Sequence, residues 1–108
     1  MMTDWLKLNV GGTMFETTRS TLMSNPDSLL AKMFDPDSAL SPASMDEDGV
    51  YRIDSCPRAF GVILNWLRYK ELLLGDCSKE EVEHFAKYFC LQDLIMELQP
   101  SMLLISTI

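Results

Sequence analysis

The chain has 108 residues, of which 47% are hydrophobic and 23% are charged, and its formal net charge is −7. This length fits one domain with a modest core, and the composition is that of a globular protein rather than a disordered one. The acidic balance argues against binding to nucleic acid or anionic lipid surfaces, because both are negatively charged.

The cysteines indicate a reducing compartment. The chain has an odd number of cysteines, which are widely spaced: Cys56, Cys77 and Cys90. The N-terminus lacks the basic and apolar regions of a secretion signal. Together these features predict reduced thiols and a cytoplasmic location. The longest apolar run, at residues 102–105, is too short to cross a bilayer, so no membrane insertion is expected.

The N-terminal residues predict a β-hairpin. Apolar and polar side chains alternate over residues 5–10, as in a half-buried strand. Gly11 and Gly12 suit the positive φ angles of a tight turn. Residues 13–18 then predict a second strand, rich in threonine.

Short helices and a loop should follow the hairpin. We expect one helical turn at residues 21–23, and Ser28 is a good N-cap for a helix with Leu29, Leu30, Met33 and Phe34 at helical spacing. Residues 35–49 contain two prolines and many acidic residues, which predicts an exposed loop. A loop of this length is either functional or disordered.

A short strand at residues 50–54 precedes the best helical pattern in the chain, which Pro57 is suited to open. One apolar stripe comprises Phe60, Ile63, Leu64 and Leu67, and a second comprises Val62, Trp66 and Tyr69. A helix that is apolar on two sides is central in the fold or shared with a neighbour. The aromatic residues of the second stripe therefore belong to the core or meet another subunit.

The last third of the chain predicts two further helices. Residues 72–74 form either a brief strand or a turn, and Ser78 with Glu81 matches a capping box. The apolar stripe then comprises Val82, Phe85, Ala86 and Phe89, and it repeats as Leu91, Leu94, Ile95 and Leu98 before Pro100. The element order predicts an α/β domain with a small sheet and packed helices.

No set of residues predicts catalysis, a cofactor or a metal. His84 is the single histidine, and a pairing with Cys90 as a nucleophile is opposed by the apolar neighbours of that cysteine, which predict a buried structural thiol. The cysteines lack the close paired spacing of structural zinc sites. Gly11 and Gly12 lead into a strand, whereas phosphate-binding loops lead into a helix.

Two features suit contact with partners. Asp46, Glu47 and Asp48 form an acidic cluster, which is either a solvated loop or a contact for a basic partner. Tyr88 lies off the apolar stripe of its helix. It is either an anchor for a partner or a cover for a neighbouring element of its own fold.

An ordered set of segments resembles the potassium-channel tetramerisation type of BTB/POZ domain, and most closely the soluble KCTD family. The segments are Leu6-Lys7-Leu8-Asn9-Val10-Gly11-Gly12, Phe15, Thr17-Thr18-Arg19-Ser20-Thr21-Leu22, Pro26-Asp27-Ser28-Leu29-Leu30, Ile53-Asp54, Pro57, Phe60, Ile63-Leu64-Asn65-Trp66-Leu67-Arg68 and Tyr88-Phe89-Cys90-Leu91-Gln92-Asp93-Leu94. The resemblance implies a BTB/POZ domain at residues 4–99, with an α/β fold, and a C-terminal extension or linker at residues 100–108.

The KCTD resemblance also implies a function without catalysis. Members of the family form rings, often pentamers, and many recruit a cullin scaffold to make a ubiquitin ligase. The chain is therefore expected to form a homo-oligomer, with a pentamer favoured over a tetramer, and to bind a cullin, while a substrate protein binds another domain. The residues that the resemblance assigns to the ring are Asn9, Thr17, Arg19, Arg52 and Asp54, and those it assigns to the cullin or another partner are Asp46, Glu47 and Tyr88.

The sequence departs from the family before the long helix. The family commonly reads Asp-Arg-Asp ahead of the proline, where this chain reads Asp54-Ser55-Cys56-Pro57. An intersubunit salt bridge from that arginine cannot form, and Ser55 is expected to cap the helix. The zinc pattern of many channels is also missing, because Asp76-Cys77 and Leu98-Gln99-Pro100 occupy its positions.

Two alternatives to a cullin adaptor remain. One is the cytoplasmic assembly domain of a voltage-gated potassium channel of the Shaker type, which the missing zinc pattern does not exclude. The other is an enzyme that uses Cys90 or Cys56, which would require an unusually reactive thiol near neutral pH.

Overall fold

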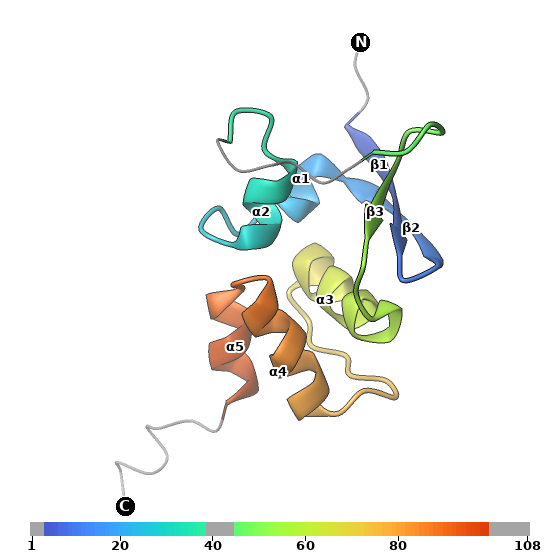
Figure 1. The fold of residues 1–108 in the computed structure, drawn as a ribbon. Coiled ribbons are helices and arrows are strands. Elements are labelled where there is room, and N and C mark those ends of the chain that lie inside the picture. The colour runs from blue at the N-terminus through green and yellow to red at the C-terminus, as the bar shows by residue number, and fades with distance from the viewer. Residues whose placement is uncertain (1–3, 39–44, 100–108) are drawn as a thin grey trace, which may run out of the picture.

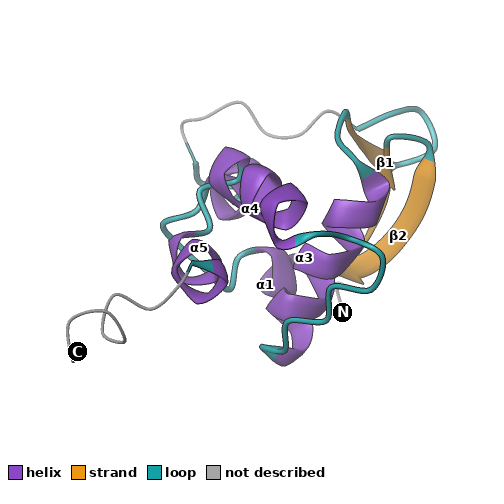
Figure 2. Cartoon of the chain, turned by 90° about the horizontal axis from the view of Figure 1, so that it is seen from below, coloured by secondary structure: helices purple, strands orange, loops and turns teal. Residues whose placement is uncertain are grey.

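A small sheet with helices on one of its faces forms the domain (Figures 1 and 2). The computed structural model describes residues 4–38 and 45–99. Within them the elements are β1 (Trp5–Val10), β2 (Thr13–Thr18), α1 (Arg19–Leu22), α2 (Leu29–Phe34), β3 (Val50–Ile53), α3 (Pro57–Tyr69), α4 (Lys79–Tyr88) and α5 (Gln92–Leu98). Part of the predicted loop, at residues 39–44, and the predicted extension at residues 100–108 lie outside the described residues.

β1 and β2 form the predicted hairpin. They pair antiparallel from Trp5–Thr18 to Val10–Thr13. The φ angles of 55° at Gly11 and 97° at Gly12 correspond to a type I′ turn, whose twist matches that of the strands. The side chain of Asn9 holds this turn, because its Oδ1 accepts a hydrogen bond of 2.8 Å from the amide of Gly12.

The sheet has the order β2-β1-β3, and β3 runs parallel to β1. Its inner face carries Leu8, Val10 and Ile53, all of which are buried. Its outer face carries Trp5 and Met14, which are 58% and 54% exposed. One face of the sheet therefore closes the core, and the other is uncovered in the single chain.

Side-chain caps begin the two short helices. Thr18 Oγ1 accepts a hydrogen bond from the amide of Thr21 at the start of α1. Ser28 Oγ accepts one from the amide of Ala31 at the start of α2, which confirms the predicted cap. Each cap satisfies an amide that has no partner within its helix.

α3 is the central helix, as its two apolar stripes predict. It lies between the sheet and α4 in Figure 2. The ring of Phe60 contacts that of Phe15 from the sheet and that of Phe89 beyond α4, with centroids 5.3 Å and 5.9 Å apart. Trp66 is buried and belongs to the core, whereas Tyr69 is 62% exposed.

The predicted cap of α3 is wrong. Pro57 does occupy the start of the helix, but the N-cap residue is Cys56, and it makes no side-chain capping bond. Ser55 Oγ is buried and has no hydrogen-bond partner. The backbone amide of Ser55 donates a hydrogen bond of 3.1 Å to the carbonyl of Ile53. Proline has no N–H, so a helix that begins with it needs one fewer capping acceptor.

The capping box of α4 is confirmed at its first residue. Ser78 Oγ accepts a hydrogen bond of 3.0 Å from the amide of Glu81. The Glu81 carboxylate also accepts a hydrogen bond from Arg58 of α3, and this contact is the main cause that lowers the pKa of Glu81. α4 is thereby joined to the start of α3.

α5 packs its apolar side into the core and is joined to α3 by a polar contact. Leu91, Leu94, Ile95 and Leu98 are all buried, as the repeated stripe predicts. Trp66 Nε1 donates a hydrogen bond of 2.7 Å to Glu97, which satisfies the buried indole. Residues 72–74 form no strand; Leu72 and Leu74 pack against the core, and Leu73 is exposed.

Candidate interaction surfaces

A polar hollow lies at the turn end of the sheet. Its lining includes Asn9, Arg52 and Asp54, three of the five residues that the sequence assigns to the ring, together with the turn glycines. Asn9 and Arg52 face each other across the parallel pair of β1 and β3, so their side chains lie on the same face of the sheet. The structure therefore brings these three residues together at the uncovered face.

Arg52 is the main exposed cation of this hollow. Its side chain is 64% exposed, and its nearest carboxylate is that of Asp46, at 3.9 Å. At this distance and exposure the pair contributes little to stability. The guanidinium keeps most of its donors for an acceptor on another molecule.

Asp46 has a structural role in the turn before β3. Its Oδ1 accepts hydrogen bonds from the amides of Asp48 and Val50, at 2.9 Å and 3.0 Å. Its own amide donates to the carbonyl of Val50. Asp46 therefore lies beside the sheet, and Glu47 is exposed in the same turn before β3. Tyr88 lies at the end of α4. The described residues do not join the acidic cluster to Tyr88 in one surface.

Two of the predicted ring residues are engaged within the chain. Thr17 is only 1% exposed, because it pairs with Leu6 on the inner face of the sheet. Its assignment to the ring is wrong, since its side chain has no surface to offer a second copy. Arg19 donates a hydrogen bond to the carbonyl of Phe34 and lies 3.7 Å from Asp4.

Tyr88 projects from the helical side of the domain. It is 57% exposed at the end of α4, and its ring contacts that of Phe89 edge to face. The prediction that Tyr88 lies off the apolar side of its helix is confirmed. Two exposed residues that sequence reasoning missed also suit a partner: Met96, which lies off the stripe of α5, and Met14, which alternates with Phe15.

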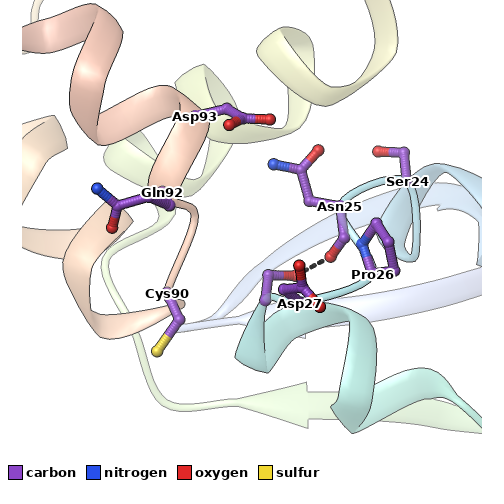
Figure 3. A pocket seen from close by; sticks show the side chains of 8 residues that line it. Ser24, Asn25, Pro26, Asp27, Cys90, Gln92 and Asp93 are labelled. Carbon is purple, nitrogen blue, oxygen red and sulfur yellow. Dashed lines mark hydrogen bonds between the residues drawn. The ribbon is translucent and has the colours of Figure 1, made fainter.

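Cys90 is exposed, so the predicted buried thiol is wrong. Its φ is 57°, and it ends α4 in a Schellman motif, in which the Cys90 amide donates to Lys87 and the Leu91 amide donates to Ala86. The left-handed residue turns outward, while its two neighbours stay in the core. Figure 3 shows Cys90 at the rim of a polar hollow with Asp27 and Gln92.

The hollow beside Cys90 lies between two turns. The turn between α1 and α2 supplies one side, and the turn between α4 and α5 the other (Figure 3). The turns are joined by the Phe89 carbonyl, which accepts a hydrogen bond of 2.9 Å from the Leu29 amide. Within the hollow, Ser28 Oγ donates a hydrogen bond of 2.7 Å to the backbone carbonyl of Asn25.

We expect iodoacetamide near neutral pH to label Cys90 first and Cys77 last. Cys77 is buried, and burial raises the pKa of its thiol, so little of the reactive thiolate forms. Mass spectrometry of the partly labelled protein, with the denatured chain as control, gives the order. Faster labelling of Cys77 would contradict its placement, and labelling of Cys90 far faster than in the denatured chain would support the enzyme alternative.

In the part of the chain that the structure describes, no group of three or more His, Cys, Asp or Glu residues is placed to hold a metal ion. The same residues include no helix that is long and apolar enough to cross a membrane. The uncovered sheet face and the exposed side chains of Tyr88 and Met96 are surfaces that a partner can reach.

Comparison with known proteins gives the family. A family model described as "BTB/POZ domain" matches residues 6–99, which include all the helices that the structure describes and nearly all of the sheet. The chain belongs to the BTB/POZ family. It is of the potassium-channel tetramerisation type, and the predicted family and fold class are confirmed.

The similar proteins are KCTD proteins. Mouse "BTB/POZ domain-containing protein KCTD9" is 43% identical over 99 residues, which cover 90% of this chain and 29% of that protein. Rat KCTD5 is 41% identical over 92 residues, which cover 84% of this chain and 39% of that protein. Human KCTD3 is 41% identical over 93 residues, which cover 86% of this chain and 11% of that protein. The chain thus spans less than two fifths of each relative's length, and the BTB/POZ family is one of protein interaction and self-association.

Proposed function

We propose that this BTB/POZ domain assembles into a closed ring of identical copies and that the ring is an adaptor for a cullin-RING ubiquitin ligase. The ring is a pentamer, and the substrate protein is held by a region other than this domain. The role is non-enzymatic and cytoplasmic, in agreement with three free thiols. The domain comprises residues 4–99.

The uncovered sheet face is the observation that carries self-assembly. A sheet normally buries its apolar face against another layer, and here Trp5 and Met14 stand exposed on the outer side. The polar hollow with Asn9, Arg52 and Asp54 adjoins them. A second copy on this face would bury the apolar side chains and could give Arg52 a closer carboxylate than that of Asp46, which adds specificity.

A ring requires two different surfaces on each copy. In a closed assembly with more than two members around one axis, each copy presents one surface to the copy before it and another to the copy after it. The sheet face supplies one of them. This face carries the bases Lys7 and Arg52 and the acids Glu16 and Asp54. It therefore suits a surface of the neighbouring copy that presents groups of both charges.

Tyr88 is the proposed centre of the cullin surface. Aromatic side chains dominate the affinity of protein interfaces when they enter a pocket on the partner. Tyr88 and Met96 are exposed on α4 and α5, which pack against each other away from the sheet. The family resemblance supports this proposal, because Tyr88 matches a position at which cullin-binding members have an aromatic residue. Cullin binding at α4 and α5 leaves the sheet face free for the ring.

Replacing Tyr88 with alanine should weaken binding to the N-terminal part of the cullin about tenfold or more, as for an anchor worth roughly 2 kcal/mol. Calorimetry or biolayer interferometry would measure the affinity. Tyr69→Ala is the matched control, because Tyr69 is an equally exposed tyrosine on α3, and its affinity should equal that of the unmodified chain. No complex at micromolar concentrations with the unmodified chain rejects the cullin role, and equal affinities of the two variants remove Tyr88 from the interface.

The KCTD relatives favour the adaptor over the assembly domain of a potassium channel. Each is 41–43% identical to this chain over most of its length. The gene that encodes the chain distinguishes the two, because a channel must continue into several membrane-spanning helices. An assembly of four copies would support the channel alternative.

A further inference from the structure

The outer edge of β2 has a defined hydrogen-bonding pattern. Val10 and Thr13 flank the two-residue turn, so these two residues exchange hydrogen bonds across the hairpin. Every second pair does the same, and the Arg19 amide continues the series with its bond of 2.9 Å to the Asp4 carbonyl. The residues between them, Met14, Glu16 and Thr18, therefore direct their backbone N–H and C=O groups away from β1.

An open strand edge of this kind is a template for another strand. Exposed N–H and C=O groups pair readily with a strand of a second chain. The far edge of the sheet is covered at the start of β3, where Met45 bridges to Tyr51 and the Asp46 amide donates a hydrogen bond of 2.8 Å to the Val50 carbonyl.

At the edge of β2, the side chain of Arg68 occupies a backbone acceptor that a further strand would use. Arg68 of α3 donates a hydrogen bond from Nη2 to the carbonyl oxygen of Glu16, an outward-directed acceptor at the middle of the edge. The same side of α3 approaches β2 at a second point, because Gly61, seven residues earlier, faces the ring of Phe15 at 3.7 Å from its Cβ position. The Arg68 side chain is exposed, so its removal leaves no cavity in the core.

We propose that Arg68 is a guard for the edge of β2, which blocks the addition of a strand from a second copy of the chain. An incoming strand needs the Glu16 carbonyl as an acceptor, and the guanidinium both occupies it and places a charge at the edge. Arg68 leaves the outer face of the sheet accessible while it blocks strand addition at the edge of β2. It therefore restricts self-association to face contacts, which can close into a ring, and excludes edge contacts, which would pair β2 of one copy with β2 of another and join separate assemblies.

The test compares Arg68→Ala with Lys79→Ala, which also removes one exposed positive charge but lies on α4. Light scattering and size-exclusion chromatography follow particle size over days at equal concentration. Arg68→Ala should grow beyond the size of the unmodified protein at least several times faster than Lys79→Ala. Hydrogen exchange on the grown material should show new protection of the Met14, Glu16 and Thr18 amides.

A second variant separates edge pairing from loss of the fold. Proline at Glu16 removes an outward N–H without removing a bond to β1, so Arg68→Ala with Glu16→Pro should return to the size of the unmodified protein. Growth of the double variant at the rate of Arg68→Ala would overturn the proposal, as would a single variant that does not grow. A melting temperature of Arg68→Ala low enough to unfold it in the assay would show that Arg68 holds the fold, and would also overturn it. The comparison is made with the unmodified chain whatever its copy number, so it stands apart from the proposed ring.

Discussion

Replacing Gly11 with alanine should destabilise the domain by about 3 kcal/mol, whereas the same replacement at Gly12 should cost about 1 kcal/mol. Both glycines have positive φ, so a side chain introduces backbone strain at either position. The difference lies in the surroundings. A Cβ at Gly11 would stand 2.3 Å from the carbonyl oxygen of Ser55, and at Gly12 nothing lies within 4 Å.

Chemical denaturation at a fixed protein concentration would measure both variants. The concentration must be equal because self-association stabilises the folded state by mass action. The clash at Gly11 involves backbone on both sides, so it cannot be relieved by a side-chain rotation. If the two variants lose equal stability, the close approach of the turn to the Ser55 carbonyl is contradicted.

Truncating Phe60 to alanine should cost about 4 kcal/mol, because a fully buried aromatic leaves a cavity that the surroundings only partly fill. Phe60 is 1% exposed and contacts the rings of Phe15 and Phe89, so it joins the sheet to the helical layer. A domain of this size is stable by about 5–15 kcal/mol, so the loss is a large fraction of the total.

Tyr69→Ala is the control for this variant, since it removes an aromatic ring from the same helix at an exposed position. Its unfolding free energy should change by less than about 0.5 kcal/mol. Thermal or denaturant unfolding followed by circular dichroism distinguishes the two. A loss below about 1 kcal/mol for Phe60→Ala would show that α3 is not the centre of the core.

The regular elements were predictable because each is specified locally. Alternation over β1, the pair of turn glycines and the caps at Ser28 and Ser78 act within a few residues, and all have the predicted structure. The two stripes of α3 also predicted a helix with neighbours on two sides. The sequence did not decide which aromatic residue of the second stripe is buried, because this depends on where α5 packs, and Trp66 meets Glu97 there.

The predictions that were wrong concern the direction in which a side chain points from a strand or a turn. Thr17 has the same parity as Phe15, and this alternation places it on the inner face despite its resemblance to a ring residue. Cys90 follows the last residue of one stripe and precedes the first of the next, which marks the position where a helix ends in a left-handed residue. Ser55 could not be placed from the sequence, because its environment depends on the approach of Gly11 from the hairpin.

The mass of the purified domain in solution tests the central claim most directly. Native mass spectrometry and sedimentation at tens of micromolar would give the number of 12.3-kDa chains in each particle. The uncovered sheet face predicts self-association, and the proposed ring has five copies as its expected number. A stable monomer at this concentration would contradict self-assembly through the sheet face.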